Sequence, residues 1–235
     1  MAGVALCHRQ KEIRMMKISP SVLSADLANL YAECVEIARA GADMIHLDVM
    51  DGAFVPNLTF GAPVIRCARP AVRIPFDVHL MIEEPVRYIE DFADAGANFI
   101  TVHIEACQNV DATLETIRAR GLRAGLAVKP GTPVESLYPY LDRLALALIM
   151  TVEPGFGGQG LLSETLPKIE TLRREIDRRG LSVEIEVDGG IHEKNIGNVA
   201  ARGAQIFVAG SAVFGKADRG AAIAALRRAA EAIEK

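Results

Sequence analysis

Short apolar runs alternate with longer amphipathic stretches along most of the chain. From residue 17 onward, the apolar runs cover residues 18–23, 44–49, 76–80, 99–104, 123–128, 144–152, 183–187 and 206–208. Between them, apolar side chains recur at helical spacing over residues 27–40, 86–95, 110–120, 164–179, 193–202 and 219–233, and two shorter stretches follow Asn57 and Thr132. The short runs indicate buried strands and the helical spacing indicates amphipathic helices. Eight such units predict an α/β fold, a single (β/α)8 TIM barrel rather than an open doubly wound sheet.

A recurring turn supports this repeat of helix and strand. A glycine stands one position past the end of most helical stretches, as a left-handed helix cap requires: Gly41, Gly96, Gly121, Gly180 and Gly203. No glycine-rich dinucleotide motif follows the first strand, which weakens the alternative of a dinucleotide-binding sheet.

The length of the chain fits one domain of this kind. Its 235 residues, 50% of them hydrophobic, are enough for a barrel with a sizeable core. We predict that the barrel spans residues 17–235 and that the polar, basic residues 1–16 form a disordered extension. These first residues lack the apolar segment of a secretory signal.

Composition argues against several classes of partner. The net charge of −4 and the pI of about 5.8 give no sign of a nucleic-acid or membrane surface. No apolar run reaches the length of about 18 residues that a membrane-spanning helix needs. Four widely spaced cysteines are typical of free thiols in a reducing cytoplasm, so we predict a cytoplasmic protein: Cys7, Cys34, Cys67 and Cys107.

Potential metal ligands and bases stand at the ends of three predicted strands. These are His46 and Asp48, then His79, and finally Asp188. Side chains two residues apart on a strand point the same way, so His46 and Asp48 can reach one point in space. Two imidazoles and two carboxylates suit a divalent cation, which polarises a ketone oxygen and stabilises an enediolate. The carboxylates can also take and return a proton.

A single histidine at a strand end is often only a hydrogen-bonded core residue. Four such groups at the catalytic end of a barrel favour the functional interpretation instead. Three further residues near strand ends are secondary candidates: Lys17, His103 and Lys129.

Three glycine turns predict a phosphate site. The loop after the sixth strand is rich in glycine, and glycine turns also follow the seventh and eighth strands, the last one opening a short helix. Loops after strands seven and eight form the common phosphate site of this fold. The residues are Gly155, Phe156, Gly157, Gly158, Gly189, Gly190, Gly210 and Ser211. By itself the first loop would indicate only a flexible segment, but the three together favour a phosphorylated substrate.

Other side chains near the polar strand ends complete the predicted site. Met50, Met81 and Met150 are either core residues or a polarisable apolar lid over the reacting carbons. Ser21 either bonds substrate hydroxyls or is bonded to solvent or backbone.

The chain resembles the ribulose-phosphate 3-epimerase family from about Lys17 to its C-terminus. The matching motifs are Ile18-Ser19-Pro20-Ser21-Val22-Leu23-Ser24-Ala25-Asp26, His46-Leu47-Asp48-Val49-Met50-Asp51-Gly52, Phe54-Val55-Pro56-Asn57, Asp77-Val78-His79-Leu80-Met81, Pro154-Gly155-Phe156-Gly157-Gly158-Gln159 and Val187-Asp188-Gly189-Gly190-Ile191. The resemblance implies a barrel that interconverts D-ribulose 5-phosphate and D-xylulose 5-phosphate in the pentose phosphate pathway.

The resemblance also implies roles for single residues. His46, Asp48, His79 and Asp188 would hold one divalent metal ion, either zinc, iron(II), manganese or cobalt. Asp48 and Asp188 would be the two acid/base groups, with Asp48 starting as the base for ribulose 5-phosphate. Ser21, His46 and His79 would contact the substrate, the glycines with Ser211 would hold its phosphate, and the three methionines would cap the intermediate.

Two positions depart from the family pattern, and alternatives stay open. Ala53 stands where the family often has histidine, and Glu153 stands where many members have asparagine. A D-allulose-6-phosphate 3-epimerase would look alike, and a non-catalytic barrel that binds phosphosugars is a rival from another class. Barrels of this family are often homo-oligomers, so we predict self-association.

Overall fold

Eight parallel strands form a barrel in the computed structural model, which describes residues 15–232. The strands are β1 (Lys17–Pro20), β2 (Ile45–Met50), β3 (Phe76–Met81), β4 (Phe99–His103), β5 (Arg123–Val128), β6 (Leu146–Met150), β7 (Glu184–Asp188) and β8 (Ile206–Ala209). From β2 to β8 each strand pairs with the next one in the chain, and β8 pairs with β1. A single parallel bridge between Ser21 and His46 closes the remaining side between β1 and β2. The predicted (β/α)8 barrel is therefore confirmed.

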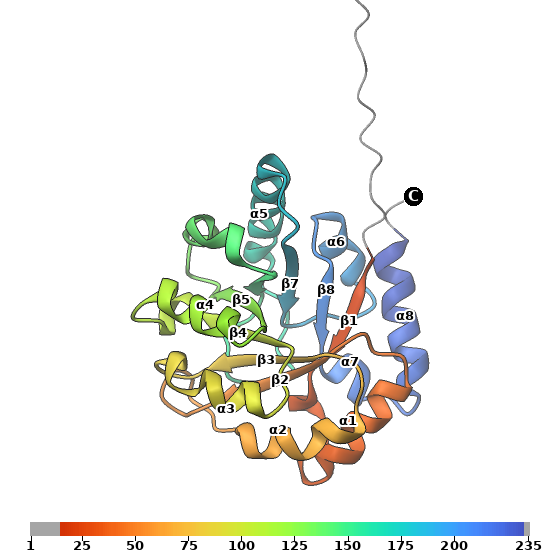
Figure 1. Ribbon diagram of the computed structural model, residues 1–235. Coiled ribbons are helices and arrows are strands. Elements are labelled where there is room, and N and C mark those ends of the chain that lie inside the picture. Colours follow the sequence, from red (N-terminus) through yellow and green to blue (C-terminus); the bar gives the residue numbers. More distant parts are fainter. Residues whose placement is uncertain (1–14, 233–235) are drawn as a thin grey trace, which may run out of the picture.

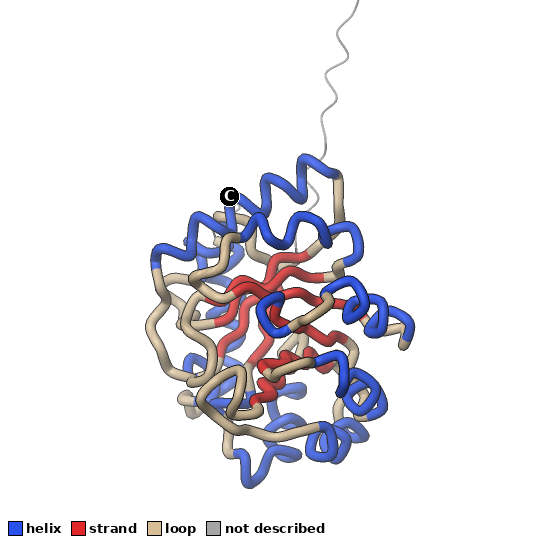
Figure 2. The backbone as a smooth tube through the Cα atoms, turned by 90° about the vertical axis from the view of Figure 1, so that its left-hand side faces the viewer, coloured by secondary structure: helices blue, strands red, loops and turns tan. Residues whose placement is uncertain are grey.

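Helices surround the strands on the outside (Figures 1 and 2). The α-helices are α1 (Leu30–Arg39), α2 (Ala62–Ala68), α3 (Ile89–Asp94), α4 (Val110–Ala119), α5 (Leu166–Arg179), α6 (Ile196–Ala201), α7 (Ser211–Phe214) and α8 (Arg219–Glu231). The 3-10 helices are η1 (Val22–Ser24), η2 (Leu27–Asn29), η3 (Arg69–Ala71), η4 (Pro85–Tyr88), η5 (Ile104–Ala106), η6 (Val134–Arg143) and η7 (Ser163–Thr165). The main hydrophobic core lies between this helical layer and the outer faces of the strands.

Local chemistry explains where the elements begin and end. The five predicted glycine caps all have positive φ angles, between +67° and +110°. The stretch after Thr132 forms the 3-10 helix η6, and Pro139 lies inside it, where its missing N–H interrupts an α-helical bond pattern. The first strand is shorter than predicted: it ends at Pro20, because Ser21 accepts a hydrogen bond from the Leu23 amide and turns the chain into η1.

The inside of the barrel divides into an apolar and a polar part. The apolar part consists of side chains from β4, β6 and β8 that pack together: Phe99, Leu146, Leu148 and Ile206. Gly125 on β5 is required there, because an added Cβ atom would lie 2.2 Å from the Thr101 hydroxyl. The other part, from β2, β3, β4 and β7, contains completely buried ionisable side chains: His46, Asp77, His79, His103 and Glu186. Burial of charge is costly unless it is paired, so this part of the barrel is a candidate for function.

The prediction for residues 1–16 falls almost wholly outside the described residues, since residues 1–14 lie beyond them, and it stays a prediction. Within residues 15–232, we find no helix with the length and apolar character to cross a membrane.

Candidate active site

Strand register brings the four predicted metal ligands together. His46 and Asp48 both point into the barrel from β2, and the parallel pairing of β2 with β3 sets Asp48 opposite His79. Asp188 reaches the same point from the end of β7, where it is paired with Met150 of β6. One ligand atom from each of the four side chains lies within 4.8 Å of all the others.

The distances in this cluster fit a divalent metal. His46 Nε2, His79 Nδ1 and Asp48 Oδ1 form a triangle whose three sides are each 3.3 Å. Asp188 Oδ2 lies 3.9 Å and 3.8 Å from the two nitrogens. For metal–ligand bonds of about 2.0–2.2 Å, the corners of a tetrahedron lie about 3.3–3.6 Å apart. Three ligand atoms match this spacing and the fourth is within a few tenths of an ångström of it.

A buried carboxylate orients the first histidine. His46 Nδ1 lies 2.7 Å from Asp77 Oδ2, and both side chains are completely buried. A proton on Nδ1 donated to Asp77 leaves the Nε2 lone pair directed into the cluster. Such a carboxylate–histidine pair behind a metal ligand fixes the tautomer and raises the basicity of the ring.

A longer chain of hydrogen bonds orients the second histidine. His79 Nε2 lies 2.9 Å from His103 Nε2, and His103 Nδ1 lies 3.3 Å from Glu105 Oε2. Burial lowers the pKa of His103 to about 4, so its ring is neutral and can accept the proton of His79 Nε2. The free lone pair of His79 is then on Nδ1, which faces the cluster.

Glu105 is the last residue in this series of hydrogen bonds. It accepts hydrogen bonds from the Lys129 amide at 2.8 Å and from the Thr132 hydroxyl. Burial alone would raise the pKa of Glu105, but these bonds together with the one from His103 lower it to about 2. The predicted secondary candidate His103 therefore lies in the site as a partner of His79.

The two carboxylates of the cluster differ in their affinity for protons. Burial would raise the pKa of Asp48, but His46 and His79 outweigh this effect and lower it far below its ordinary value. Burial, together with the charge of Asp48, raises the pKa of Asp188 to about 6. Burial would lower the pKa of His46, yet Asp48 and Asp77 raise it well above 6.5. One carboxylate thus stays ionised while the other readily holds a proton.

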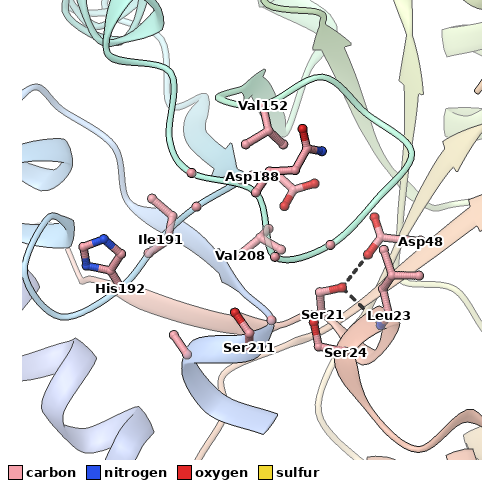
Figure 3. A pocket seen from close by; sticks show the side chains of 18 of the residues that line it. Ser21, Leu23, Ser24, Asp48, Val152, Asp188, Ile191, His192, Val208 and Ser211 are labelled. Carbon is pink, nitrogen blue, oxygen red and sulfur yellow. Dashed lines mark hydrogen bonds between the residues drawn. The ribbon is translucent and has the colours of Figure 1, made fainter. Parts of the chain in front are cut away.

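A cavity of about 920 Å³ opens above the cluster (Figure 3). Its wall includes Asp48 and Asp188 together with every other predicted substrate-binding residue except the two histidines: Ser21, Met50, Met81, Met150, Gly155, Phe156, Gly157, Gly158, Gly189, Gly190, Gly210 and Ser211. His46 and His79 are completely buried and lie outside this lining. Their predicted contact with substrate stays a prediction.

Tight backbone packing builds the glycine side of the cavity. Gly190 has a φ angle of +66°, and an added Cβ atom would lie 2.3 Å from the Leu161 amide nitrogen. Thr151 holds the preceding turn, because its amide donates to the Asp188 carbonyl at 2.8 Å and its hydroxyl to the Gly189 carbonyl at 2.7 Å. Gly210 lies against Ser24, whose hydroxyl would be 2.4 Å from an added Cβ atom. These turns leave backbone N–H groups available to an anion.

Ser21 and the three methionines cover the rest of the cluster. The Ser21 hydroxyl donates to Asp48 Oδ2, as Figure 3 shows. The other oxygen of that carboxylate, Oδ1, lies 3.3 Å from His79 Nδ1. Met50 and Met81 pack with Val55, while Met150 belongs to the apolar part of the barrel interior. All three side chains are at least 95% buried.

Comparison with known proteins decides the family. A family model described as the ribulose-phosphate 3 epimerase family matches residues 17–214. The ribulose-phosphate 3-epimerase of Bacillus subtilis is 48% identical over 214 residues, covering 91% of this chain and 99% of the relative. That of Mycobacterium leprae is 49% identical and covers 92% and 96%, respectively.

The chain belongs to the ribulose-phosphate 3-epimerase family.

Solved structures outside this family share the fold. KGPDC from Streptococcus mutans superposes with a TM-score of 0.71 at 12% identity, covering 94% of this chain and all of that one. A 3-hexulose-6-phosphate synthase gives a TM-score of 0.61 at 21% identity over 91% of this chain and 99% of that one. At this level of identity the likeness shows the barrel alone.

The two departures from the epimerase family pattern are not part of the cavity wall. Ala53 is exposed, and its amide donates to Asp51 Oδ1 at 2.9 Å. Glu153 is also exposed, and its carbonyl accepts a hydrogen bond from the Gln159 side chain. Neither lines the cavity. Of the other secondary candidates, Lys17 pairs with Glu184 at 2.7 Å, and Lys129 lies 3.8 Å from the centre of the Phe54 ring.

Sequence reasoning missed several supporting residues of this epimerase family site. Asp77 precedes His79 by two positions and Glu186 precedes Asp188 by two, so strand alternation points both into the barrel. Burial is the main cause that raises the pKa of Glu186 well above its ordinary value, and the negative charge of Asp77 adds to it. Glu186 therefore lies beside Asp77 in surroundings that favour its neutral form. Asp77 and Glu186 could have been predicted from the sequence, because each is an acidic residue two positions before a predicted metal ligand.

Proposed function

We propose that this chain inverts C3 of D-ribulose 5-phosphate to give D-xylulose 5-phosphate, with Asp48 and Asp188 as the two acid/base groups. The observation that carries the proposal is the convergence of these carboxylates, from β2 and β7, on one pair of histidine nitrogens. Epimerisation at a carbon next to a carbonyl needs a base to remove the proton and an acid to return it on the other face.

A divalent metal ion held by His46, Asp48, His79 and Asp188 supplies positive charge that stabilises the oxygens of the enediolate. The donor set of two imidazole nitrogens and two carboxylate oxygens suits zinc, iron(II), manganese or cobalt. The buried partners of the histidines support this assignment, since they direct one nitrogen lone pair of each ring to the same point.

The proton transfers follow from the difference between the two carboxylates. Asp48, whose pKa is far below its ordinary value, is ionised and removes the C3 proton of ribulose 5-phosphate. Asp188, whose pKa is raised to about 6, is the carboxyl of the pair that takes up a proton more readily, and it delivers one to the opposite face of C3. In the reverse reaction the two residues exchange roles, so they act as a coupled pair.

The remaining groups of the cavity bind and shield the sugar. Backbone N–H groups of the glycine turns and Ser211 hold the phosphate, which fixes C3 between the carboxylates. Ser21 keeps Asp48 in place through its hydrogen bond and can contact a substrate hydroxyl. Met50, Met81 and Met150 exclude water from the planar intermediate, which would otherwise be exposed to side reactions.

The same proposal includes the metabolic pathway, the cellular compartment and the oligomeric state of the enzyme. Its substrate and product are intermediates of the pentose phosphate pathway, and its free cysteines are typical of a cytoplasmic protein. We also propose that the chain forms a homo-oligomer.

A coupled assay for xylulose 5-phosphate, run on the purified chain with ribulose 5-phosphate, tests the activity. We expect turnover accompanied by incorporation of solvent deuterium at C3, and a lower rate with D-allulose 6-phosphate. Asp48→Asn and Asp188→Asn should each abolish turnover. Glu184→Gln, at the other end of β7, is the matched control and should leave it unchanged. Full activity in Asp188→Asn would refute the two-base scheme.

A further inference from the structure

A half-buried lysine on α5 holds the loop that follows β5. This loop, residues 129–132, is called the β5 loop below. The ammonium group of Lys168 donates hydrogen bonds to three of its backbone carbonyls: those of Lys129 at 3.3 Å, Pro130 at 2.5 Å and Thr132 at 2.6 Å. An ammonium group has three N–H donors, so this loop can use all of them. One side chain from α5 therefore fixes the shape of the whole loop.

Burial of this lysine carries a cost that an apolar side chain would not have. Loss of contact with water lowers the pKa of Lys168, whereas the charges of three glutamates raise it: Glu105, Glu135 and Glu153. A polar group in such a place needs hydrogen-bond partners, and the carbonyls of the β5 loop are those partners. The bonds to the loop are therefore what the ammonium group contributes at this position.

The same loop binds one carboxylate oxygen of Glu105. The Lys129 amide donates to Glu105 Oε1 at 2.8 Å, and the Thr132 hydroxyl donates to the same oxygen. The second oxygen, Oε2, lies 3.3 Å from His103 Nδ1. Lys129 and Thr132 are also two of the three residues whose carbonyls Lys168 binds. The position of this carboxylate therefore depends on the ammonium group behind the loop.

Ring contacts connect the β5 loop to His103 by a second route. Lys129 Nζ lies 3.8 Å from the centre of the Phe54 ring, where the electrons of the ring attract a cation. The centre of the Phe54 ring is 4.9 Å from that of His103, and the His103 ring stacks on His79 with centres 5.0 Å apart. Both routes from the loop thus end at His103, the hydrogen-bond partner of His79.

We propose that Lys168 is a positioning residue for the metal ligand His79, on which it acts through the β5 loop. The inference rests on the proposed metal-dependent function and adds a residue to it. The loop holds Glu105, and Glu105 with His103 keeps the proton of His79 on Nε2, so that the lone pair of Nδ1 faces the cluster. Lys168 is not part of the cavity wall, so it acts without touching the substrate. Outer partners of a metal ligand change metal affinity by about 10- to 100-fold.

Two measurements on Lys168→Met, which keeps a long side chain but removes the donors, test the proposal. Lys17→Met is the matched control, because Lys17 is also half-buried and pairs with Glu184 at the start of β7. NMR of the imidazole nitrogens in the metal-free protein should show one His79 tautomer, protonated on Nε2, in wild type and Lys17→Met, and a mixture in Lys168→Met. Cobalt(II) affinity should fall about 10-fold in Lys168→Met and stay unchanged in Lys17→Met. Thr132→Val, which removes only the hydroxyl bond to Glu105, should lower it in the same direction.

Two results would overturn the inference. In the first, Lys168→Met keeps the single His79 tautomer of the wild type. In the second, Lys17→Met shows the same mixture of tautomers as Lys168→Met, so the effect comes from the loss of any half-buried lysine. A wild-type chain that binds no cobalt would instead refute the proposed metal site. The tautomer of His79 is measured without metal, so failure of this inference and failure of the proposed function can be told apart.

Discussion

Glu105 connects the electrostatics of the site to the stability of the fold, and Glu105→Gln isolates its charge. Glutamine keeps the length of the side chain and an oxygen that can accept from the Lys129 amide. It removes the negative charge that three groups, His103, Lys129 and Thr132, now stabilise. The substitution therefore imitates the protonated form of the glutamate without changing the packing.

The lowered pKa gives the size of the effect. A change in the pKa of Glu105 from 4.5 to about 2 corresponds to about 3 kcal/mol in favour of the ionised form. The side chain keeps 23% of its surface exposed, so screening by water reduces the expected loss to about 2 kcal/mol. Because the folded-state pKa is lowered, this stability is present above about pH 4.5 and is lost as the pH falls toward 2.

Urea unfolding of the metal-free protein measures this loss directly. At pH 7 we expect Glu105→Gln to lower the free energy of unfolding by about 2 kcal/mol, and the gap from wild type should shrink steadily between pH 4.5 and pH 2.5. Because His103 then loses its charged partner, metal affinity should also fall by about 10-fold or more. Titration with cobalt(II), followed by its visible absorption, reports that affinity.

Glu115→Gln, an exposed glutamate on α4, is the control and should change neither quantity. A difference in unfolding free energy that is the same at pH 7 and pH 2.5 would refute the reasoning, since it could not arise from the charge of Glu105. If cobalt affinity were unchanged in Glu105→Gln, the charge of Glu105 would contribute to stability but not to the orientation of His79 as a metal ligand.

Three further outcomes are expected. Asp188→Asn should lower turnover by about 1,000-fold or more, with a melting temperature within a few degrees of wild type, as measured by the coupled assay and calorimetry. Exhaustive treatment with a chelator should abolish turnover, and zinc, manganese, iron(II) or cobalt should restore it; full activity in a preparation shown by elemental analysis to be metal-free would contradict the proposed site. Gly190→Ala should raise the KM for ribulose 5-phosphate, because its Cβ atom would meet the Leu161 backbone, whereas Gly180→Ala, with a similar φ angle and open space around it, should affect stability alone.

The architecture could be predicted from the sequence because its signals are local. The run at residues 123–128 matches β5 at both ends, and the glycine caps mark helix ends correctly. Strand alternation also brings His46 and Asp48 to the same side without any tertiary information. Where local rules compete, the prediction is less accurate: the apolar pattern continues through Leu23, yet Ser21 caps η1 and ends the strand early.

The partners of the site could not be predicted in the same way, because they depend on contacts between strands. The pairing of His46 with Asp77 depends on the register of β2 against β3, and the contact of His79 with His103 depends on β3 against β4. Apolar periodicity shows that a residue points inward, but it does not show which inward residue of the next strand it meets. These contacts between neighbouring strands fix the tautomers of both histidines, so the tautomers could not be predicted from the sequence.

The charge inside the barrel explains why these partners are arranged around a cation site. Four carboxyl groups and two imidazoles are clustered there: Asp48, Asp77, Glu186, Asp188, His46 and His79. Such a cluster cannot be buried with every acid ionised, because like charges at this distance raise the pKa of one another. The chain meets this constraint with raised pKa values for Glu186 and Asp188 and for the intervening His46. A divalent cation would provide the missing positive charge and displace the proton from His46, so metal affinity should rise with pH. The same buried carboxyl groups, with the cation and the histidines between them, would then affect both the stability of the fold and proton transfer to the substrate.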